Sequence, residues 1–347
     1  MKRIAFFCWR PYQMMNIINL VYNNCDKANM EMDLYVLNYN SLADLQYKIR
    51  DTYLFNNVYV VEPFHFKSGL CGKIQRLFYF LKPKVIDRQC PDIEIVNRYD
   101  KLYASGLDPF FVNFVQLNKN ASVSLLEDGL LSYLDDPRKV ETNSFYKVID
   151  FLFNKGPYNI KIESSYLYGI AFANNDIDYS LNELTRLNNK TVSILKTIFG
   201  YHPQDMYEQN KFIYFGNDLY LSGIDEELLK CIKDKVIYRK HPMQSDFKTT
   251  LKNIVIDSGE NLWELLCEDY ITDNSVLISE FSTAQFTPFL LYGKKPTIIL
   301  TFKMTGHFSD KEKVYYESFA EKFRNVGQQK VYCPNSIDEF VEILYAK

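Results

Sequence analysis

Two adjacent carboxylates and a glycine, Glu127-Asp128-Gly129, directly follow a buried-strand pattern at residues 122–126. The glycine permits a tight turn of the backbone. A carboxyl group that lies beside a second carboxylate and is partly buried has a raised pKa. A carboxylate tuned in this way can act as a general base and take the proton of a nucleophilic hydroxyl. For the tripeptide alone, an acidic turn that caps the following helix is the alternative interpretation.

A histidine in a basic segment indicates phosphate chemistry. His241 and Pro242 follow two cations at the end of a second strand pattern, at residues 236–239. The imidazole can donate a proton or a hydrogen bond to a leaving phosphate, and the proline makes the turn rigid. A second His-Pro pair at residues 202–203 shows that the dipeptide by itself is weakly specific.

Three further polar residues suit the recognition of a nucleotide. Ser282 and Thr283 precede an apolar helix that we expect to begin near Ala284, and a helix N-terminus with hydroxyl groups can bind phosphate. Glu264, near the start of another expected helix, can accept hydrogen bonds from ribose hydroxyls or a base amine. Plain N-capping and an exposed helix glutamate are the respective alternatives.

Two α/β domains are expected to position these residues. Buried-strand patterns alternate with helix-compatible segments, which favours parallel sheets covered on both faces, and ligands collect beyond the carboxyl ends of such strands. A polar, Asn-rich middle at 174–210 ends at a fresh strand, so we predict Rossmann-like domains at 1–205 and 206–347 with a cleft between them. The strand patterns lie at residues 2–8, 32–37, 57–61, 101–104, 122–126, 212–215, 236–239, 253–256, 275–278 and 297–300.

Composition and charge exclude several classes of protein. A formal net charge of -3 gives no overall attraction for nucleic acid, and seven scattered cysteines form neither a disulfide framework nor a zinc motif. The apolar run at residues 4–9 is too short for a signal sequence, and no run approaches the roughly 18 residues of a membrane span. We therefore expect a cytoplasmic protein.

Taken in order, the motifs resemble those of one family. The segment 127–133 (EDGLLSY) is similar to the acidic motif of bacterial sialyltransferases, and 240–242 to their His-Pro motif. Ser282-Thr283 resembles their Ser-Ser/Thr motif, and 262–266 the segment whose glutamate holds the nucleoside. The start at 7–13 resembles that of glycosyltransferase family 52, the lipooligosaccharide and capsule sialyltransferases, although Arg10 stands where that family usually has Thr.

A second segment, 215–220, looks like the one that opens the donor domain of this family, with Asn217-Asp218 in place of the usual Gln-Pro. The resemblance implies a GT-B fold and an inverting transfer of sialic acid from CMP-sialic acid to a sugar hydroxyl, without a required metal. It implies acceptor binding and the base in the first domain and donor binding in the second. On this resemblance, the base is expected to be Glu127 or Asp128, with Asp218 as the alternative, and His241 is expected to assist the departure of CMP.

By the same resemblance, the residues that bind the donor are expected to be Gly129, Gly216, Asn217, Pro242, Glu264, Ser282 and Thr283. Asp176 and Asp178 have the spacing of a metal-binding D-x-D motif, but they follow no convincing strand, so we expect a solvated loop and no metal. Polysialylation, another nucleotide-sugar donor and an inactive glycan-binding module remain alternatives. The acceptor is expected to be a surface oligosaccharide or a lipid-linked glycan, and the sequence does not identify which. A homodimer is one of the oligomeric states that the sequence leaves open.

A basic stretch at residues 67–88 is the last feature. Lysines and arginines alternate there with aliphatic and aromatic residues, and no acid occurs before Asp87. Such a stretch can lie on an anionic membrane surface at the inner face of the membrane or guide an anionic acceptor. An ordinary helix with one face on the sheet fits the pattern equally well.

Overall fold

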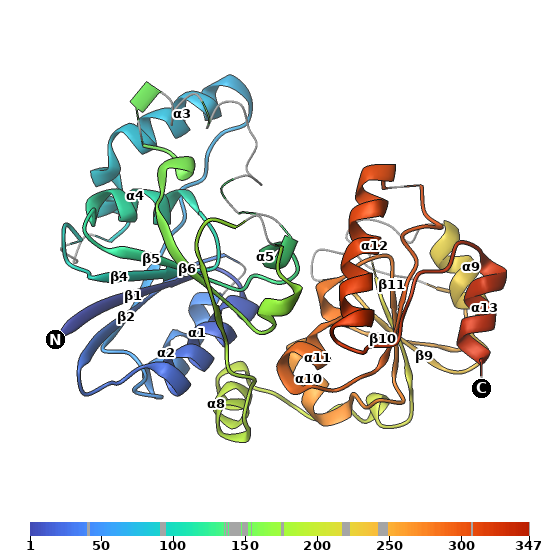
Figure 1. Ribbon diagram of the computed structural model, residues 1–347. Helices are drawn as coiled ribbons and strands as arrows, with labels where there is room; N and C mark the ends of the chain where they lie inside the picture. The colour runs from blue at the N-terminus through green and yellow to red at the C-terminus, as the bar shows by residue number, and fades with distance from the viewer. Residues whose placement is uncertain are drawn as a thin grey trace. The chain divides into compact units, whose positions relative to one another are not determined.

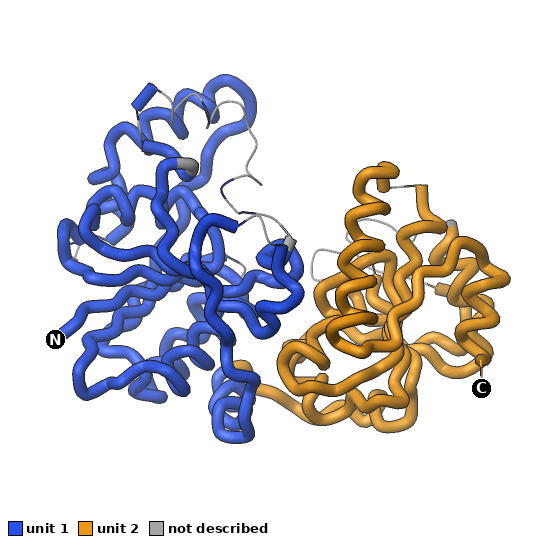
Figure 2. Tube along the Cα trace, viewed as in Figure 1, with its two compact units in different colours: residues 1–198 blue, residues 199–347 orange. Residues whose placement is uncertain are grey.

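The computed structural model describes residues 1–347 except 40–41, 91–94, 135, 137, 139–146, 148–151, 154, 175–176, 217–222, 242–248, 307 and 347. The chain divides into two compact units, Met1–Ile198 and Phe199–Lys347 (Figure 2). The sequence analysis placed this boundary at 205/206, within the polar segment that joins the last helix of the first unit to the first strand of the second.

The first unit is built on a seven-stranded sheet in the order β3-β2-β1-β4-β5-β6-β7. All paired strands are parallel. The strands are β1 (Lys2–Cys8), β2 (Met30–Leu37), β3 (Asn57–Val61), β4 (Lys101–Ala104), β5 (Ser122–Leu126), β6 (Ile162–Leu167) and β7 (Ser180–Glu183). The described helices are α1 (Pro11–Asn24), α2 (Gln46–Arg50), α3 (Gly69–Leu81), α4 (Pro109–Leu117), α5 (Leu131–Leu134) and α8 (Asn189–Phe199).

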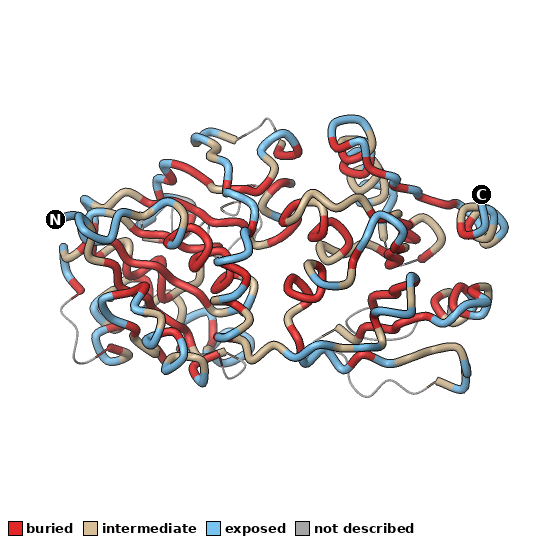
Figure 3. The backbone as a smooth tube through the Cα atoms, turned by 90° about the horizontal axis from the view of Figure 1, so that it is seen from below, coloured by how far each residue is buried: buried red, intermediate tan, exposed pale blue. Residues whose placement is uncertain are grey.

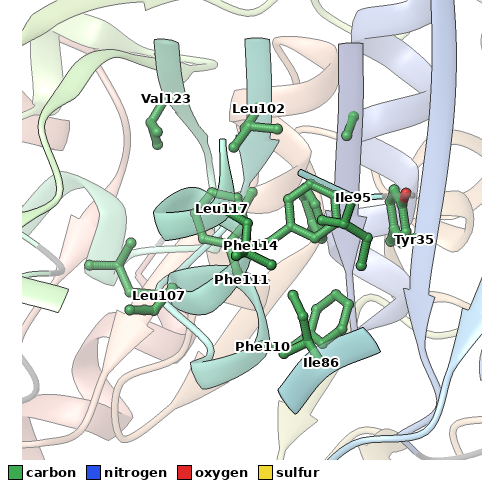
Figure 4. Close-up of a cluster of buried hydrophobic side chains, with 14 of the residues drawn as sticks. Tyr35, Ile86, Ile95, Leu102, Leu107, Phe110, Phe111, Phe114, Leu117 and Val123 are labelled. Atoms are coloured by element: carbon green, nitrogen blue, oxygen red, sulfur yellow. The ribbon is translucent and has the colours of Figure 1, made fainter. Parts of the chain in front are cut away.

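Helices cover both faces of this sheet, with α1 and α2 on one face and α3 and α4 on the other (Figure 1). Phe110, Phe111 and Phe114 of α4 are buried and point toward β1 and the strands beside it, where they pack on Phe7 and Tyr35 (Figure 4). Asp108 accepts a hydrogen bond from Phe110 N and caps α4, so the helix begins directly after the loop that follows β4.

The second unit repeats the same plan with six parallel strands in the order β10-β9-β8-β11-β12-β13. The strands are β8 (Phe212–Phe215), β9 (Val236–Arg239), β10 (Ile254–Asp257), β11 (Val276–Ser279), β12 (Thr297–Leu300) and β13 (Val331–Tyr332). The described helices are α9 (Gly223–Cys231), α10 (Trp263–Tyr270), α11 (Thr287–Tyr292), α12 (Asp310–Asn325) and α13 (Ile337–Tyr345).

Two apolar clusters cover the two faces of this second sheet. One joins α9 and α13 to the strands, and the other joins α10 to them. Figure 3 shows buried residues concentrated along the strands and exposed residues on the loops and on the outer turns of the helices. Short 3₁₀ turns connect the elements: η1 (Leu42–Leu45), η2 (Pro83–Arg88), η3 (Pro157–Asn159), η4 (Ile170–Phe172), η5 (Asp205–Tyr207) and η6 (Thr283–Gln285).

Counted from its own first strand, each sheet contains the order 3-2-1-4-5-6 that is typical of a Rossmann-like domain, and the first sheet adds a seventh strand at its edge. The prediction of two such domains is confirmed. Strands β6, β7 and β13 were not among the predicted strands. Of these, β7 is an edge strand with no buried residue, so it carries no continuous apolar run. Among the described residues, no helix combines the length and the apolar character needed to cross a bilayer.

Candidate active site

A cavity of about 340 Å³ lies at the carboxyl ends of β1, β4 and β5 in the first unit. Neighbouring strands β1 and β4 lead into α1 and α4 on opposite faces of the sheet, and the gap between two such loops is where open parallel sheets bind ligands. The lining residues are Trp9, Arg10, Ser105, Gly106, Leu107, Asp108, Pro109, Leu125, Leu126, Asp128, Leu131, Ser132, Ser165 and Tyr179.

Asp128 is a carboxylate that lines this cavity. Its side chain is 23% exposed, and Oδ1 accepts a hydrogen bond of 3.0 Å from Gln13 Nε2. Arg10 Nη1 lies 4.0 Å from Oδ2. Burial raises the pKa of Asp128, while the Gln13 hydrogen bond and the Arg10 charge oppose that rise. The group therefore combines access to a ligand with an increased affinity for a proton, as a general base requires.

Glu127, its neighbour, points into the protein and is fully buried. Oε1 accepts a hydrogen bond of 2.6 Å from Tyr12 Oη, and Oε2 accepts from Tyr133 Oη and, at 3.0 Å, from Tyr168 N. Burial raises the pKa of Glu127 to about 7, against the lowering effect of these three donors. The carboxylate joins α1, α5 and the segment after β6, and it contributes no atom to the cavity surface.

Gly129 adopts a φ of 81°, a left-handed conformation that favours glycine. The predicted tight turn is therefore present. Ser132 N donates to Gly129 O at 3.1 Å, and Asp128 N donates to Ser132 Oγ at 2.7 Å. The turn fixes the backbone so that successive carboxylates face opposite sides, one inward and one toward the cavity.

The cavity lining also contains an aromatic ring and a buried hydroxyl. Trp9 packs on Gly106, where an added Cβ would lie 3.2 Å from the indole Cζ2. Trp9 N donates to Gln13 Oε1 at 2.9 Å, so Gln13 holds both Trp9 and Asp128. Ser105 is 7% exposed, and its Oγ has no hydrogen-bond partner within the described part of the chain. A buried hydroxyl of this kind can bind a polar ligand atom.

In the second unit, His241 lies two residues after the end of β9 and is half-buried. Pro242, Asn217 and the alternative base Asp218 lie outside the described residues. Gly216 donates its N–H to Arg239 O at 2.9 Å, which ties the end of β8 to the end of β9.

Glu264 occupies the first turn of α10 and is buried rather than exposed. Burial raises its pKa, while its own backbone N–H and the charge of Arg239 lower it. The Arg239 guanidinium forms an ion pair with Asp257 and lies 5.6 Å from the centre of the Trp263 ring. Glu264 thus lies near a buried ion pair, Arg239–Asp257, at the carboxyl ends of β9 and β10.

Ser282 and Thr283 differ from the expectation in one respect. Ser282 Oγ accepts a hydrogen bond from Ala284 N at 3.3 Å and caps a single 3₁₀ turn, η6, whereas the helix α11 starts only at Thr287. Pro288 fixes that start, because proline fits the first turn of a helix and lacks the N–H that a longer helix would use. The predicted helix start near Ala284 was wrong, and both hydroxyl residues are half-buried.

The D-x-D pair shows no arrangement of metal ligands in the part that is described. Asp178 forms an ion pair with Arg138, which also binds Asp136 at 2.5 Å, and Asp176 lies outside the described residues. No group of three or more histidine, cysteine, aspartate or glutamate residues within the described ranges is placed to hold a metal ion.

Four residues of the site had no predicted role: Tyr12, Gln13, Tyr133 and Ser105. The first three lie inside the motifs at 7–13 and 127–133. The presence of both motifs in the sequence was therefore the signal that could have indicated these residues. Nothing in the sequence distinguished Ser105 from other serines that follow a strand.

Comparison with known proteins extends these findings. No family model matches the chain, and no curated protein matches it in sequence. Solved structures do match: UGT89C1 of Arabidopsis thaliana has a TM-score of 0.57 at 9% identity, covering 99% of this chain and 88% of the other. The calicheamicin glycosyltransferase CalG4 gives 0.52 at 11% identity over 100% and 90% of the two chains.

A sialyltransferase from Photobacterium damsela matches with a TM-score of 0.50 at 15% identity, covering 96% of this chain and 81% of the other. At these identities the likeness shows the fold, which is the two-domain GT-B fold. The predicted fold class is confirmed, and membership of glycosyltransferase family 52 stays a prediction.

Proposed function

We propose that the protein is an inverting glycosyltransferase that moves sialic acid from CMP-sialic acid to a hydroxyl of a terminal sugar, such as galactose, in a bacterial surface glycan. The observation that carries the proposal is Asp128, an accessible carboxylate with a raised pKa in a cavity at the β1/β4 junction of a GT-B fold. The motif order described above, from 127–133 to Ser282-Thr283, supports sialic acid as the group transferred.

The acceptor hydroxyl would enter the cavity and hydrogen-bond to Asp128. As its oxygen forms a bond with the anomeric carbon of the donor, the proton passes to the carboxylate. The bond from the anomeric carbon to the phosphate oxygen breaks through an oxocarbenium-like state, and CMP leaves with the electron pair. Trp9 offers an apolar face to the acceptor ring, and Ser105 Oγ a hydrogen bond.

Glu127 is less suited to the role of base, because its side chain is fully buried and its hydrogen bonds come from donors within the protein. Its proposed role is to position the turn that presents Asp128. Asp218, which is not described, remains the alternative base.

On the donor side, His241 would give a proton or a hydrogen bond to the departing phosphate. Ser282 and Thr283 would bind phosphate oxygens, and Glu264 would bind the ribose or the base, with Gly216, Asn217 and Pro242 shaping the site. Because α11 is short and begins beyond these hydroxyls, the side chains of Ser282 and Thr283 carry more of this role than a helix dipole does.

The test is incubation of the purified protein with CMP-sialic acid and oligosaccharides ending in galactose or sialic acid, with mass spectrometry of the products. The expected product carries one added sialic acid, and free CMP appears with it. A ladder of longer products would indicate polysialylation. Transfer from CMP-Kdo or a UDP-sugar, but not from CMP-sialic acid, would refute the proposed donor.

Matched variants assign the residues. Asp128→Asn is expected to abolish transfer while CMP binding persists, and His241→Ala to lower turnover by ~10²-fold or more, the usual contribution of acid–base assistance. His202→Ala is the control, since His202 is exposed and lies in the segment that precedes β8 in the second unit. Full activity of Asp128→Asn, or equal losses in both histidine variants, would contradict these assignments.

A further inference from the structure

Helix α3 is firmly attached to the first unit along one side. Tyr79 and Phe80 are buried in the core that α4 also fills. Asn113 Nδ2 donates to Tyr79 O at 2.8 Å, and the Arg76 guanidinium lies 5.2 Å from the centre of the Phe66 ring. The helix is therefore a fixed element of the fold, although it lies beyond α4 when viewed from the sheet (Figure 1).

The opposite side of α3 is apolar and exposed. Leu70, Ile74 and Phe78 are 73%, 45% and 56% exposed. Residues four apart lie on one face of an α-helix, so these three side chains form a continuous stripe about 12 Å long. Isolated exposed apolar residues are ordinary, whereas an aligned row on one helix indicates a binding surface.

Exposed cations occur before, within and after this stripe along the chain. Lys67 precedes the helix, Lys73 lies within it, and three more exposed cations follow in η2 and just before it: Lys82, Lys84 and Arg88. The first acid in this stretch is Asp87, which is also exposed. We call the three apolar residues and the five cations the α3 patch.

We propose that the α3 patch docks on the surface of an anionic lipid bilayer. Leu70, Ile74 and Phe78 would enter the boundary between headgroups and acyl chains, and the cations would bind the lipid phosphates. A lipid surface suits the patch better than a second copy of this chain, because a twofold dimer through the patch would bring two sets of five cations together. The inference does not depend on the transfer chemistry.

Binding to vesicles tests the proposal directly. The whole protein is sedimented with phosphatidylcholine vesicles that contain or lack phosphatidylglycerol, at low and at high salt. We expect binding to the anionic vesicles at least tenfold stronger than to the neutral ones and weakened by salt, since screening shortens the range of the attraction.

Two sets of substitutions separate the contributions of charge and apolar surface. Lys73→Gln, Lys82→Gln and Lys84→Gln together should weaken binding on the order of 100-fold, because each cation near an anionic surface contributes about fivefold. Leu70→Ser, Ile74→Ser and Phe78→Ser together should also reduce binding at least tenfold. The control combines Lys311→Gln, Val314→Ser and Val326→Ser, at exposed positions of α12 and its C-cap, and should bind like the wild type.

Insertion is tested separately with Phe78→Trp, whose fluorescence should shift to shorter wavelength with anionic vesicles and stay unchanged with neutral ones. Circular dichroism of every variant checks that the fold is kept. The proposal would be overturned if the wild-type protein did not bind anionic vesicles at low salt. The proposal would also be overturned if the wild type formed an oligomer, the triple serine variant were monomeric and neither bound vesicles. The stripe would then be an interface between copies of the chain.

Discussion

Arg10 lies where it can tune the proposed base. Its charge lowers the pKa of Asp128, so Arg10→Gln should raise that pKa and move the acidic limb of the pH profile of kcat/KM to higher pH. Measurement of transfer rates across the acidic range would show the shift. Lys190→Gln, an exposed cation on α8, is the control. An unchanged acidic limb in Arg10→Gln would mean that another group is the base.

Glu127 should make the stability of the protein depend on pH. Its pKa is about 7 in the folded chain against an ordinary 4.5, so between these values the folded state keeps a proton that the unfolded state has released. The free energy of unfolding should therefore fall by about 3 kcal/mol from this group as pH rises through that window.

Urea denaturation at pH 5 and pH 8 measures this effect. Glu127→Gln should lack that part of the fall, whereas Glu163→Gln, which changes an exposed carboxylate on β6, should keep it. Equal pH dependence in the wild type and in Glu127→Gln would show that the buried carboxyl group titrates like an exposed one.

The sequence could predict that Glu127 and Asp128 follow a strand, but not which of the two carboxylates faces the cavity. Glu127 and Asp128 carry the same functional group, and their environments differ partly through Tyr12 and Gln13, each 115 residues from its partner in the chain. Long-range partners of this kind leave no local pattern, so the proposal that Asp128 is the base relies on the fold and not on the sequence alone.

At the scale of elements, the loop after β4 shapes the cavity through Gly106. In Gly106→Ala the new Cβ would lie 3.2 Å from the Trp9 ring, which must then shift by a few tenths of an ångström. We expect a severalfold rise in the KM for the acceptor with little change in the KM for the donor, and a loss of stability below ~1 kcal/mol.

Steady-state kinetics with each substrate varied in turn would test this expectation. Gly306→Ala is the matched control, because an added Cβ there meets no atom within 4 Å. A rise in the KM for the donor alone would contradict the placement of the acceptor in this cavity.

Several of the strands that the sequence predicted have continuous apolar runs, such as β1, β8 and β12, because strands of a covered parallel sheet are buried on both faces. The same rule explains why β7 and β13 were not predicted. β7 lies at the sheet edge without a buried residue, and β13 has only two residues, so neither offers a pattern to detect.

At the scale of the whole molecule, the proposal needs no divalent ion, since His241 and the hydroxyls of Ser282 and Thr283 would stabilise the leaving phosphate. Transfer should therefore survive EDTA, measured as the initial rate before and after chelation. Loss of activity that Mg²⁺ restores would return attention to Asp176 and Asp178, even though Asp178 binds Arg138 in the structure.

The pairing of β1 with β4 also imposes an order in time on the newly made chain. Arg3 N donates to Asp100 Oδ2, 97 residues later, so one edge of β1 has no partner until β4 leaves the ribosome. At ~5–20 residues per second, that delay is roughly 5–20 s. The cavity walls that follow β1 and β4 cannot meet earlier. A nascent chain stalled before residue 100 would expose an open strand edge that chaperones and aggregating chains can both reach.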